Sequence, residues 1–138
     1  MSPLHPTQVD TELELHLVVP DAGTVLLRVT LSYTTDDPFA VTAAFAGDGL
    51  TIEWVFARDL LIGGLDGPTG EGDVHVWPSW GSGRDLVLLS LTSPDGHAVL
   101  EADATDLRGF LQRTLDLVPE GTESAHVDVD SELATFFA

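Results

Sequence analysis

The chain has 138 residues, and 23 acidic residues against five arginines and no lysine give it a formal charge of −18. Because nucleic acids and anionic membranes recruit proteins through basic surfaces, this charge disfavours both as partners. The absence of cysteine excludes disulfides, thiolate nucleophiles and cysteine-ligated zinc. A length near 140 residues is typical of one domain, so we expect residues 1–138 to fold as a single unit.

The first ten residues do not show the pattern of a targeting signal. Residues 1–10 have neither a basic start nor an apolar core, and no apolar run approaches about 18 residues. We therefore expect a cytoplasmic protein without direct membrane insertion. Residues 1–10 are expected to form a mobile N-terminal segment, and residues 122–138 a C-terminal tail.

Alternating apolar and polar residues predict four strands in the first half of the chain. These strands are expected at residues 11–19, 25–33, 39–45 and 50–56. Short turns separate them, so neighbouring strands should pair as antiparallel hairpins. A short helical turn is expected at residues 57–62, stopped by Gly63 and Gly64, and residues 65–72 should form a loop.

The second half begins with three more strands and ends in helices. Strands are expected at residues 73–77, 85–91 and 97–102, with residues 78–83 as a connecting loop. Apolar residues then recur at helical spacing, which predicts a helix that begins at Asp103 or Thr105 as N-cap and ends at Pro119. A last short helix is expected from Ser131. The predicted fold class is α+β, with two antiparallel sheets and packed helices.

No pattern in the sequence predicts catalysis or a cofactor. The glycines at 67, 70 and 72 have no following lysine and lie among acidic residues, so they do not form a phosphate-binding loop. The histidines show no metal-binding spacing. An enzyme built on His75 and Asp73 has no support beyond residue type, and we expect a protein that is not an enzyme.

Several sequence blocks resemble the SsgA-like proteins of sporulating actinobacteria. They are EWVFARDLL at 53–61, GDVHVWP at 72–78, SPDG at 93–96, FLQRT at 110–114 and VPEGTE at 118–123. The resemblance runs from residues 12–13 to residues 130–133.

This resemblance implies a non-enzymatic adaptor in sporulation-specific cell division. Members of the family direct septum placement, and the role implied for this chain is to recruit and support the tubulin-like division protein FtsZ, with an SsgA-type positioning protein as a second partner. The implied fold is similar to that of the whirly proteins, which bind single-stranded nucleic acid, and it is assembled as a homotrimer. The implied location is the cytoplasm, concentrated at the division septum. A single-stranded nucleic-acid-binding protein is the alternative that this fold leaves open.

Tryptophan positions provide the candidate contact residues. Trp54 continues an apolar strand face and is expected in the core. Trp77 and Trp80 lie beside glycine and proline, and exposed indoles of this kind often anchor partner contacts. Rings folded back over a sheet edge are the alternative. With Leu65, these two tryptophans are predicted to form an apolar patch that binds a partner or a second subunit.

Arg58 and Asp59 are the charged candidates. They follow a strand and precede the predicted helical turn. An ion pair or a helix cap is one interpretation, and a partner contact is the other.

Overall fold

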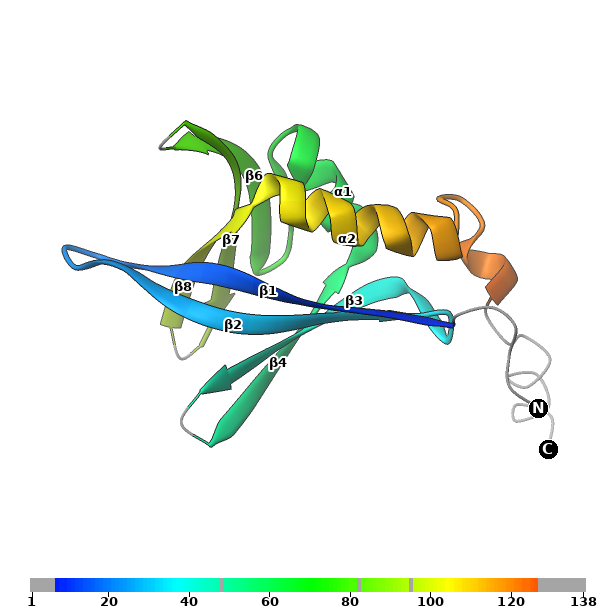
Figure 1. Cartoon of the computed structure of the whole chain (residues 1–138), viewed down its shortest axis with the longest axis horizontal. Coiled ribbons are helices and arrows are strands. Elements are labelled where there is room, and N and C mark those ends of the chain that lie inside the picture. The colour runs from blue at the N-terminus through cyan, green and yellow to red at the C-terminus, as the bar shows by residue number, and fades with distance from the viewer. Residues whose placement is uncertain (1–6, 48, 82, 95, 127–138) are drawn as a thin grey trace.

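The computed structural model describes residues 7–47, 49–81, 83–94 and 96–126. Within these residues the chain forms eight strands, two α-helices and one 3₁₀ helix (Figure 1). The strands are β1 (Gln8–Val19), β2 (Gly23–Thr34), β3 (Asp37–Gly47), β4 (Leu50–Ala57), β5 (Thr69–Glu71), β6 (Val74–Gly81), β7 (Arg84–Ser93) and β8 (Gly96–Asp103). The helices are α1 (Arg58–Asp66), α2 (Ala104–Leu117) and η1 (Glu123–His126). The helix expected from Ser131 lies outside the described residues.

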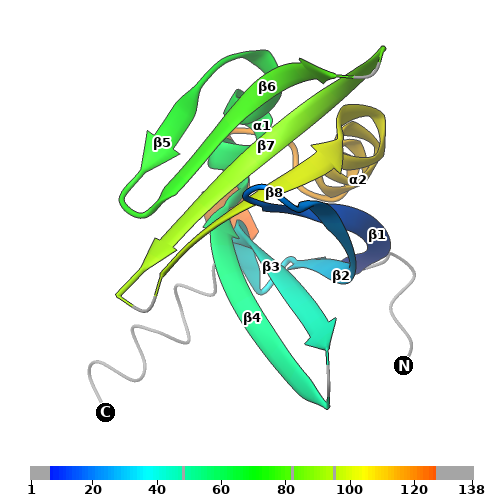
Figure 2. The same ribbon diagram turned by 90° about the vertical axis from the view of Figure 1, so that its left-hand side faces the viewer.

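All eight strands belong to one antiparallel sheet, in the order β4-β3-β2-β1-β8-β7-β6-β5. β1 and β8 join its two halves through only two pairs, His16 with Glu101 and Leu17 with Leu100. The prediction of two separate sheets is therefore wrong, although the α+β class is confirmed. The sheet is strongly curled, and its halves meet at this narrow junction (Figure 2).

The core lies between the two halves of the sheet and the helices. Alternate residues of β1, such as Leu13 and Leu15, are buried there together with Val76 of β6 and Phe110 of α2. This arrangement follows from the period-two pattern of the strands, which places every second side chain on one face. β1 begins at Gln8, so it includes the last part of the segment expected to be mobile.

α1 continues through the two glycines that were predicted to stop it. The helix ends at Asp66, three residues beyond Gly63. The glycines instead allow close packing: a Cβ on Gly64 would lie 2.2 Å from a methyl group of Val76, and one on Gly63 would lie 2.9 Å from the Thr69 hydroxyl. The absence of a side chain therefore lets α1 lie directly against β6.

β5 and the end of β6 were both predicted as loop. β5 adds a three-residue edge that pairs with residues 74–76 of β6. Beyond Val76, β6 is itself the edge of the sheet, and Pro78 pairs there with Val87 of β7. A proline lacks the N–H that a central strand needs but is tolerated at an edge, which explains how the strand continues to Gly81.

α2 has a well-defined start. Asp103 is its N-cap, and its carboxylate accepts hydrogen bonds from the backbone N–H groups of Thr105 at 2.8 Å and Asp106 at 3.3 Å. This settles the choice between Asp103 and Thr105. Asp106 in the first turn adds a negative charge at the positive end of the helix.

Alanine at two helical glycines should shift stability in opposite directions. At Gly64 the new methyl group would collide with buried Val76, and overpacking of this kind costs roughly 1–3 kcal/mol. At Gly109 of α2 an added Cβ meets nothing within 4 Å. There Gly109→Ala should stabilise the protein by about 0.5–1 kcal/mol, the difference in helix propensity. Urea unfolding of both variants measures this, and a stabilising Gly64→Ala would contradict the packing of α1 on β6.

Candidate partner-binding surface

Arg58, predicted as either an ion-pair residue or a partner contact, lies inside the protein. Its side chain is 1% exposed. One guanidinium nitrogen donates to the backbone carbonyls of Thr114 at 3.1 Å and Val118 at 2.7 Å, and the other donates to the carboxylate of Glu123 at 3.1 Å. The ion-pair interpretation is thus confirmed, with a partner 65 residues away in the chain. In this structure the side chain is not available at the surface.

The two carbonyls that Arg58 binds lie at the carboxyl end of α2. This end carries a partial negative charge, and the last turn of α2 contains no basic residue of its own. Arg58, the first residue of α1, therefore supplies the missing cation from another helix. Its guanidinium also lies over the ring of Tyr33, 5.0 Å from the ring centre. Tyr33 in turn donates a 2.8 Å hydrogen bond to the carbonyl of Pro38.

Glu123 completes this buried cluster. Its carboxylate accepts a 2.7 Å hydrogen bond from the Gly121 N–H, in addition to the bond from Arg58. The pKa of Glu123 lies below its ordinary value of 4.5, first because its own backbone N–H bonds to the carboxylate and also because Arg58 and Gly121 donate to it. Burial acts in the opposite direction. The cluster therefore holds Glu123 in its charged form.

The other candidate contact residues do not form one patch. Trp77 is half-buried, whereas Trp80 is 70% exposed. Because they are three residues apart on β6, they project from opposite faces of the strand. Leu65 packs partly against the core, and Asp59 is exposed in the first turn of α1. Their role in binding stays a prediction.

Trp54 follows its predicted orientation. It is half-buried, packs against the core and stacks on Phe56, with ring centres 6.5 Å apart and planes 13° from parallel. Ile52, two residues earlier on the same strand, is 58% exposed. The apolar face of β4 therefore extends beyond the part that the core covers.

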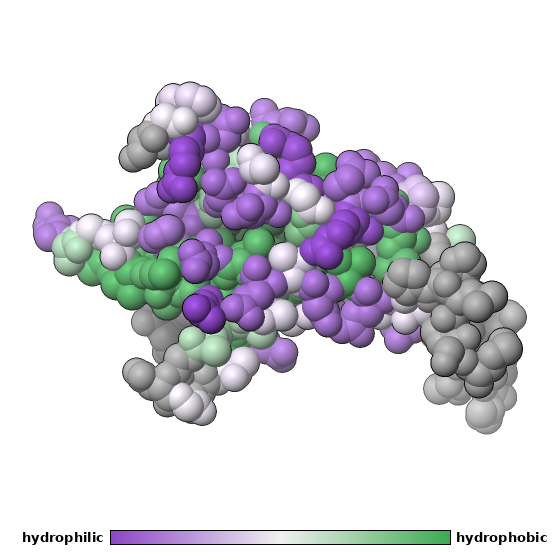
Figure 3. Space-filling model, in the orientation of Figure 1, coloured by the Kyte–Doolittle hydropathy of each residue, from purple (hydrophilic) through white to green (hydrophobic). Residues whose placement is uncertain are grey.

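This uncovered apolar face forms a groove at the junction of the two halves of the sheet. The groove has a volume of about 170 Å³ and is lined by residues of six strands: Leu17, Leu27, Phe45, Ile52, Trp54, Leu91, Ala98 and Leu100. Nearby, the β1–β2 hairpin exposes Val25 and Leu26, and Figure 3 shows an apolar area along this hairpin behind its hydrophilic tip. Sequence reasoning missed this groove. The signal that could have indicated it is the apolar alternation, which continues to the ends of these strands, beyond the part that the core covers.

The described residues contain no group of three or more histidine, cysteine, aspartate or glutamate side chains placed to hold a metal ion. Among the helices formed by the same residues, none is long and apolar enough to cross a membrane. What these residues do present is exposed apolar surface, at Trp80, at Val55 of β4 and around the groove. Surfaces of this kind are typical of protein contacts.

Comparison with known proteins places the chain in a family. Residues 27–123 match the family described as "Streptomyces sporulation and cell division protein, SsgA". The sporulation-specific cell division protein SsgB of Streptomyces coelicolor is 50% identical over 133 residues, which is 96% of this chain and 97% of the relative. SsgB of Thermobifida fusca is 46% identical over 93% of this chain and 94% of the relative.

Solved structures of proteins of the same family are also similar to this chain. The crystal structure of an SsgA-like sporulation-specific cell division protein from Thermobifida fusca matches with a TM-score of 0.86 and 44% identity, over 99% of each chain. A structure of Streptomyces coelicolor SsgB matches with a TM-score of 0.84 and 51% identity, over 87% of this chain and 95% of that one. The chain is an α+β protein of sporulation-specific cell division. It belongs to the SsgA family.

Replacing Arg58 with methionine should destabilise the protein strongly. Arg58→Met removes the guanidinium that donates to Glu123 and to the carbonyls of Thr114 and Val118, and breaking a buried ion pair on one side costs about 3 kcal/mol. Arg84→Met is the matched control, because Arg84 is exposed on β7 and surface substitutions change stability by about 0.5 kcal/mol or less. If urea unfolding gave the same loss of unfolding free energy for both variants, the buried Arg58 cluster would contribute no more to stability than an exposed arginine.

Glu123→Gln should lower stability in a pH-dependent way. Because the folded-state pKa of Glu123 lies below its unfolded value, the stabilisation by its carboxylate is complete above that unfolded value of 4.5 and is lost as the pH falls through the folded-state pKa. The gap in unfolding free energy between wild type and Glu123→Gln should therefore be largest near neutral pH and shrink in acid. Glu120→Gln, which removes an exposed carboxylate, controls for net charge. A gap that stays constant down to about pH 3 would contradict the charged ion pair.

Proposed function

We propose that this protein is a non-enzymatic adaptor in sporulation-specific cell division, which recruits and supports FtsZ at future septum sites. The observation that carries the proposal is its similarity to proteins named for sporulation-specific cell division, at 44–50% identity over more than nine-tenths of the chain for several of them. An adaptor needs contact surfaces and no catalytic centre, and the exposed apolar residues of the described chain supply such surfaces. The proposed location is the cytoplasm, concentrated at the division septum.

Self-association into a homotrimer is part of this proposal. The apolar groove at the β1–β8 junction and the exposed Val25 and Leu26 support it, because apolar area left in water is stabilised when a second chain covers it. An SsgA-type positioning protein is the second proposed partner. A whirly-like role in nucleic-acid binding is disfavoured by the charge of −18, and one of the five arginines is taken up in the buried cluster.

Sedimentation with polymerised FtsZ tests the proposal directly. We expect the protein to pellet with FtsZ filaments and to have the mass of three chains in free solution. An oligonucleotide at the same concentration should not bind near physiological salt. A protein that stays in the supernatant with FtsZ present would overturn the adaptor function, and a monomeric mass would overturn the trimer.

Truncation of Trp80 should weaken partner or subunit binding. An indole that is 70% exposed is costly to leave in water, and exposed tryptophans that anchor interfaces contribute about 2 kcal/mol or more. Trp80→Ala should therefore lower FtsZ affinity or dissociate the oligomer, whereas the predicted contribution of Trp77 on the opposite strand face is tested separately by Trp77→Ala. If both variants keep wild-type affinity and mass, the predicted contact role of the two tryptophans is wrong.

A further inference from the structure

The strand β1 has an unpaired backbone edge. β1 pairs with β2 along its whole length, but on its other side only His16 and Leu17 pair with β8. Within the described residues no strand pairs with residues 8–15 on that side. An unpaired edge presents a row of N–H and C=O groups to any extended chain that reaches it. At about 3.4 Å per residue, this edge is roughly 25 Å long.

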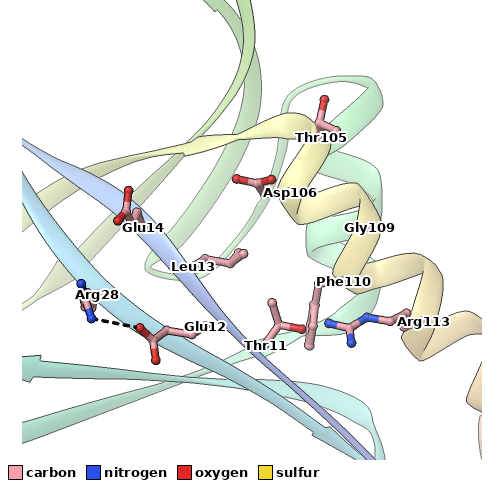
Figure 4. Close-up of a pocket in the computed structure, with 10 residues that line it drawn as sticks. All are labelled: Thr11, Glu12, Leu13, Glu14, Arg28, Thr105, Asp106, Gly109, Phe110 and Arg113. Atoms are coloured by element: carbon pink, nitrogen blue, oxygen red, sulfur yellow. Dashed lines mark hydrogen bonds and ion pairs between the residues drawn. The ribbon is translucent and has the colours of Figure 1, made fainter.

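The helix α2 lies beside this edge without closing it. After β8 separates from β1, the chain enters α2, which runs alongside residues 11–14 of β1 (Figure 4). Helix and strand enclose an open groove with a volume of about 760 Å³. A groove between a strand edge and a helix suits an extended peptide, because main-chain hydrogen bonds form on one side and side-chain contacts on the other.

Gly109 leaves room for a close contact in this groove. It lies inside α2, faces the groove and is exposed, and a Cβ there would meet nothing within 4 Å. A glycine in a helix interior lowers stability, and no neighbour in the described structure requires it here. Close approach of another chain segment is a physical reason for a glycine at such a position, as Gly64 shows where α1 packs against the Val76 side chain of β6.

The charges of the groove are separated along its length. Glu14 and Asp106 lie at the end where α2 begins, and Arg113 lies at the other end, near Thr11 (Figure 4). Glu12 and Arg28, which also line the groove, form an exposed ion pair at 3.5 Å. The positive end of α2 is already satisfied by the Asp103 cap. The groove therefore favours a segment with a basic side chain at the Glu14 end and an acidic one at the Arg113 end.

We propose that the groove between β1 and α2 binds an extended segment of a partner protein by strand addition to residues 8–15. The segment carries a basic residue that lies over Glu14 and Asp106 and an acidic residue beside Arg113. This inference rests on the proposed adaptor function, since it assigns one surface through which the adaptor holds its partner. A strongly acidic segment, such as residues 127–138 of this chain, fits the Glu14 end poorly.

Two tryptophan substitutions on α2 test the groove. Gly109→Trp fills it, whereas Gln112→Trp adds the same ring at an exposed position outside the groove lining. With FtsZ filaments as the probe, Gly109→Trp should weaken co-sedimentation about tenfold or more and Gln112→Trp should change it little. Circular dichroism and light scattering establish that both variants keep the fold and the mass of the wild type. Equal binding by the two variants would overturn the groove but leave the adaptor function standing. If wild type itself fails to bind FtsZ, the adaptor function fails.

Amide hydrogen exchange identifies the occupant. Strand addition by the partner should slow exchange when FtsZ is added at alternate residues within 8–15, those whose N–H groups point away from β2, because these amides become hydrogen-bonded. Protection of these amides in the free protein that disappears on dilution would mean that a second copy of the chain fills the groove. Protection in the free protein that is lost when Phe136 and Phe137 are both replaced by serine would mean that the chain's own end fills it. Either result would overturn a partner segment as the occupant.

Discussion

One buried guanidinium connects the parts of this protein that are far apart in sequence. Arg58 stands where β4 passes into α1, and its hydrogen bonds reach the last carbonyls of α2 and the carboxylate of Glu123. These bonds pair a buried cation with a carboxylate and with backbone carbonyls at the end of α2, and removing one partner from such a buried set is costly. The position of α2 over the sheet, and with it the shape of the groove between β1 and α2, depends on this cluster.

The strand β1 also determines the arrangement of the protein, because its two ends have different neighbours: β8 at one end and α2 at the other. Near His16 and Leu17 it joins the two halves of the sheet, and the apolar groove opens at that junction. Towards Gln8 it separates from β8 and faces α2 across the charged groove. A long central strand with such a short second pairing leaves two differently lined surfaces on one scaffold. This arrangement suits the proposed adaptor function, in which the protein holds more than one partner.

Much of the fold follows from local sequence patterns, and the remainder depends on contacts between distant residues. Period-two alternation located seven strands, and Asp103 with the apolar spacing after it located α2. That all strands join in one sheet could not be predicted, because the two residue pairs between β1 and β8 have no local signature in the sequence.

Single residues were misinterpreted for a similar reason. Gly64 was interpreted as a helix stop because Val76, the residue whose contact requires a glycine there, lies on another element. Arg58 was ambiguous for the same reason: its acidic partner lies 65 residues away, while exposed Asp59 is adjacent. The tryptophan positions indicated exposed aromatic residues. The grooves could not be predicted in this way, because their lining residues come from several elements that meet only in the folded protein.

Native-state hydrogen exchange in Arg58→Lys tests most directly whether the buried guanidinium holds α2 in place. Lysine keeps the charge but cannot supply several donors in the planar arrangement that Arg58 uses. The account predicts that amides in the last turn of α2, including that of Val118, which donates to the Thr114 carbonyl, and those of η1 lose protection. Amides of β6, β7 and β8 should keep theirs. Unchanged protection at the end of α2, or an equal loss throughout the sheet, would contradict the role assigned to Arg58.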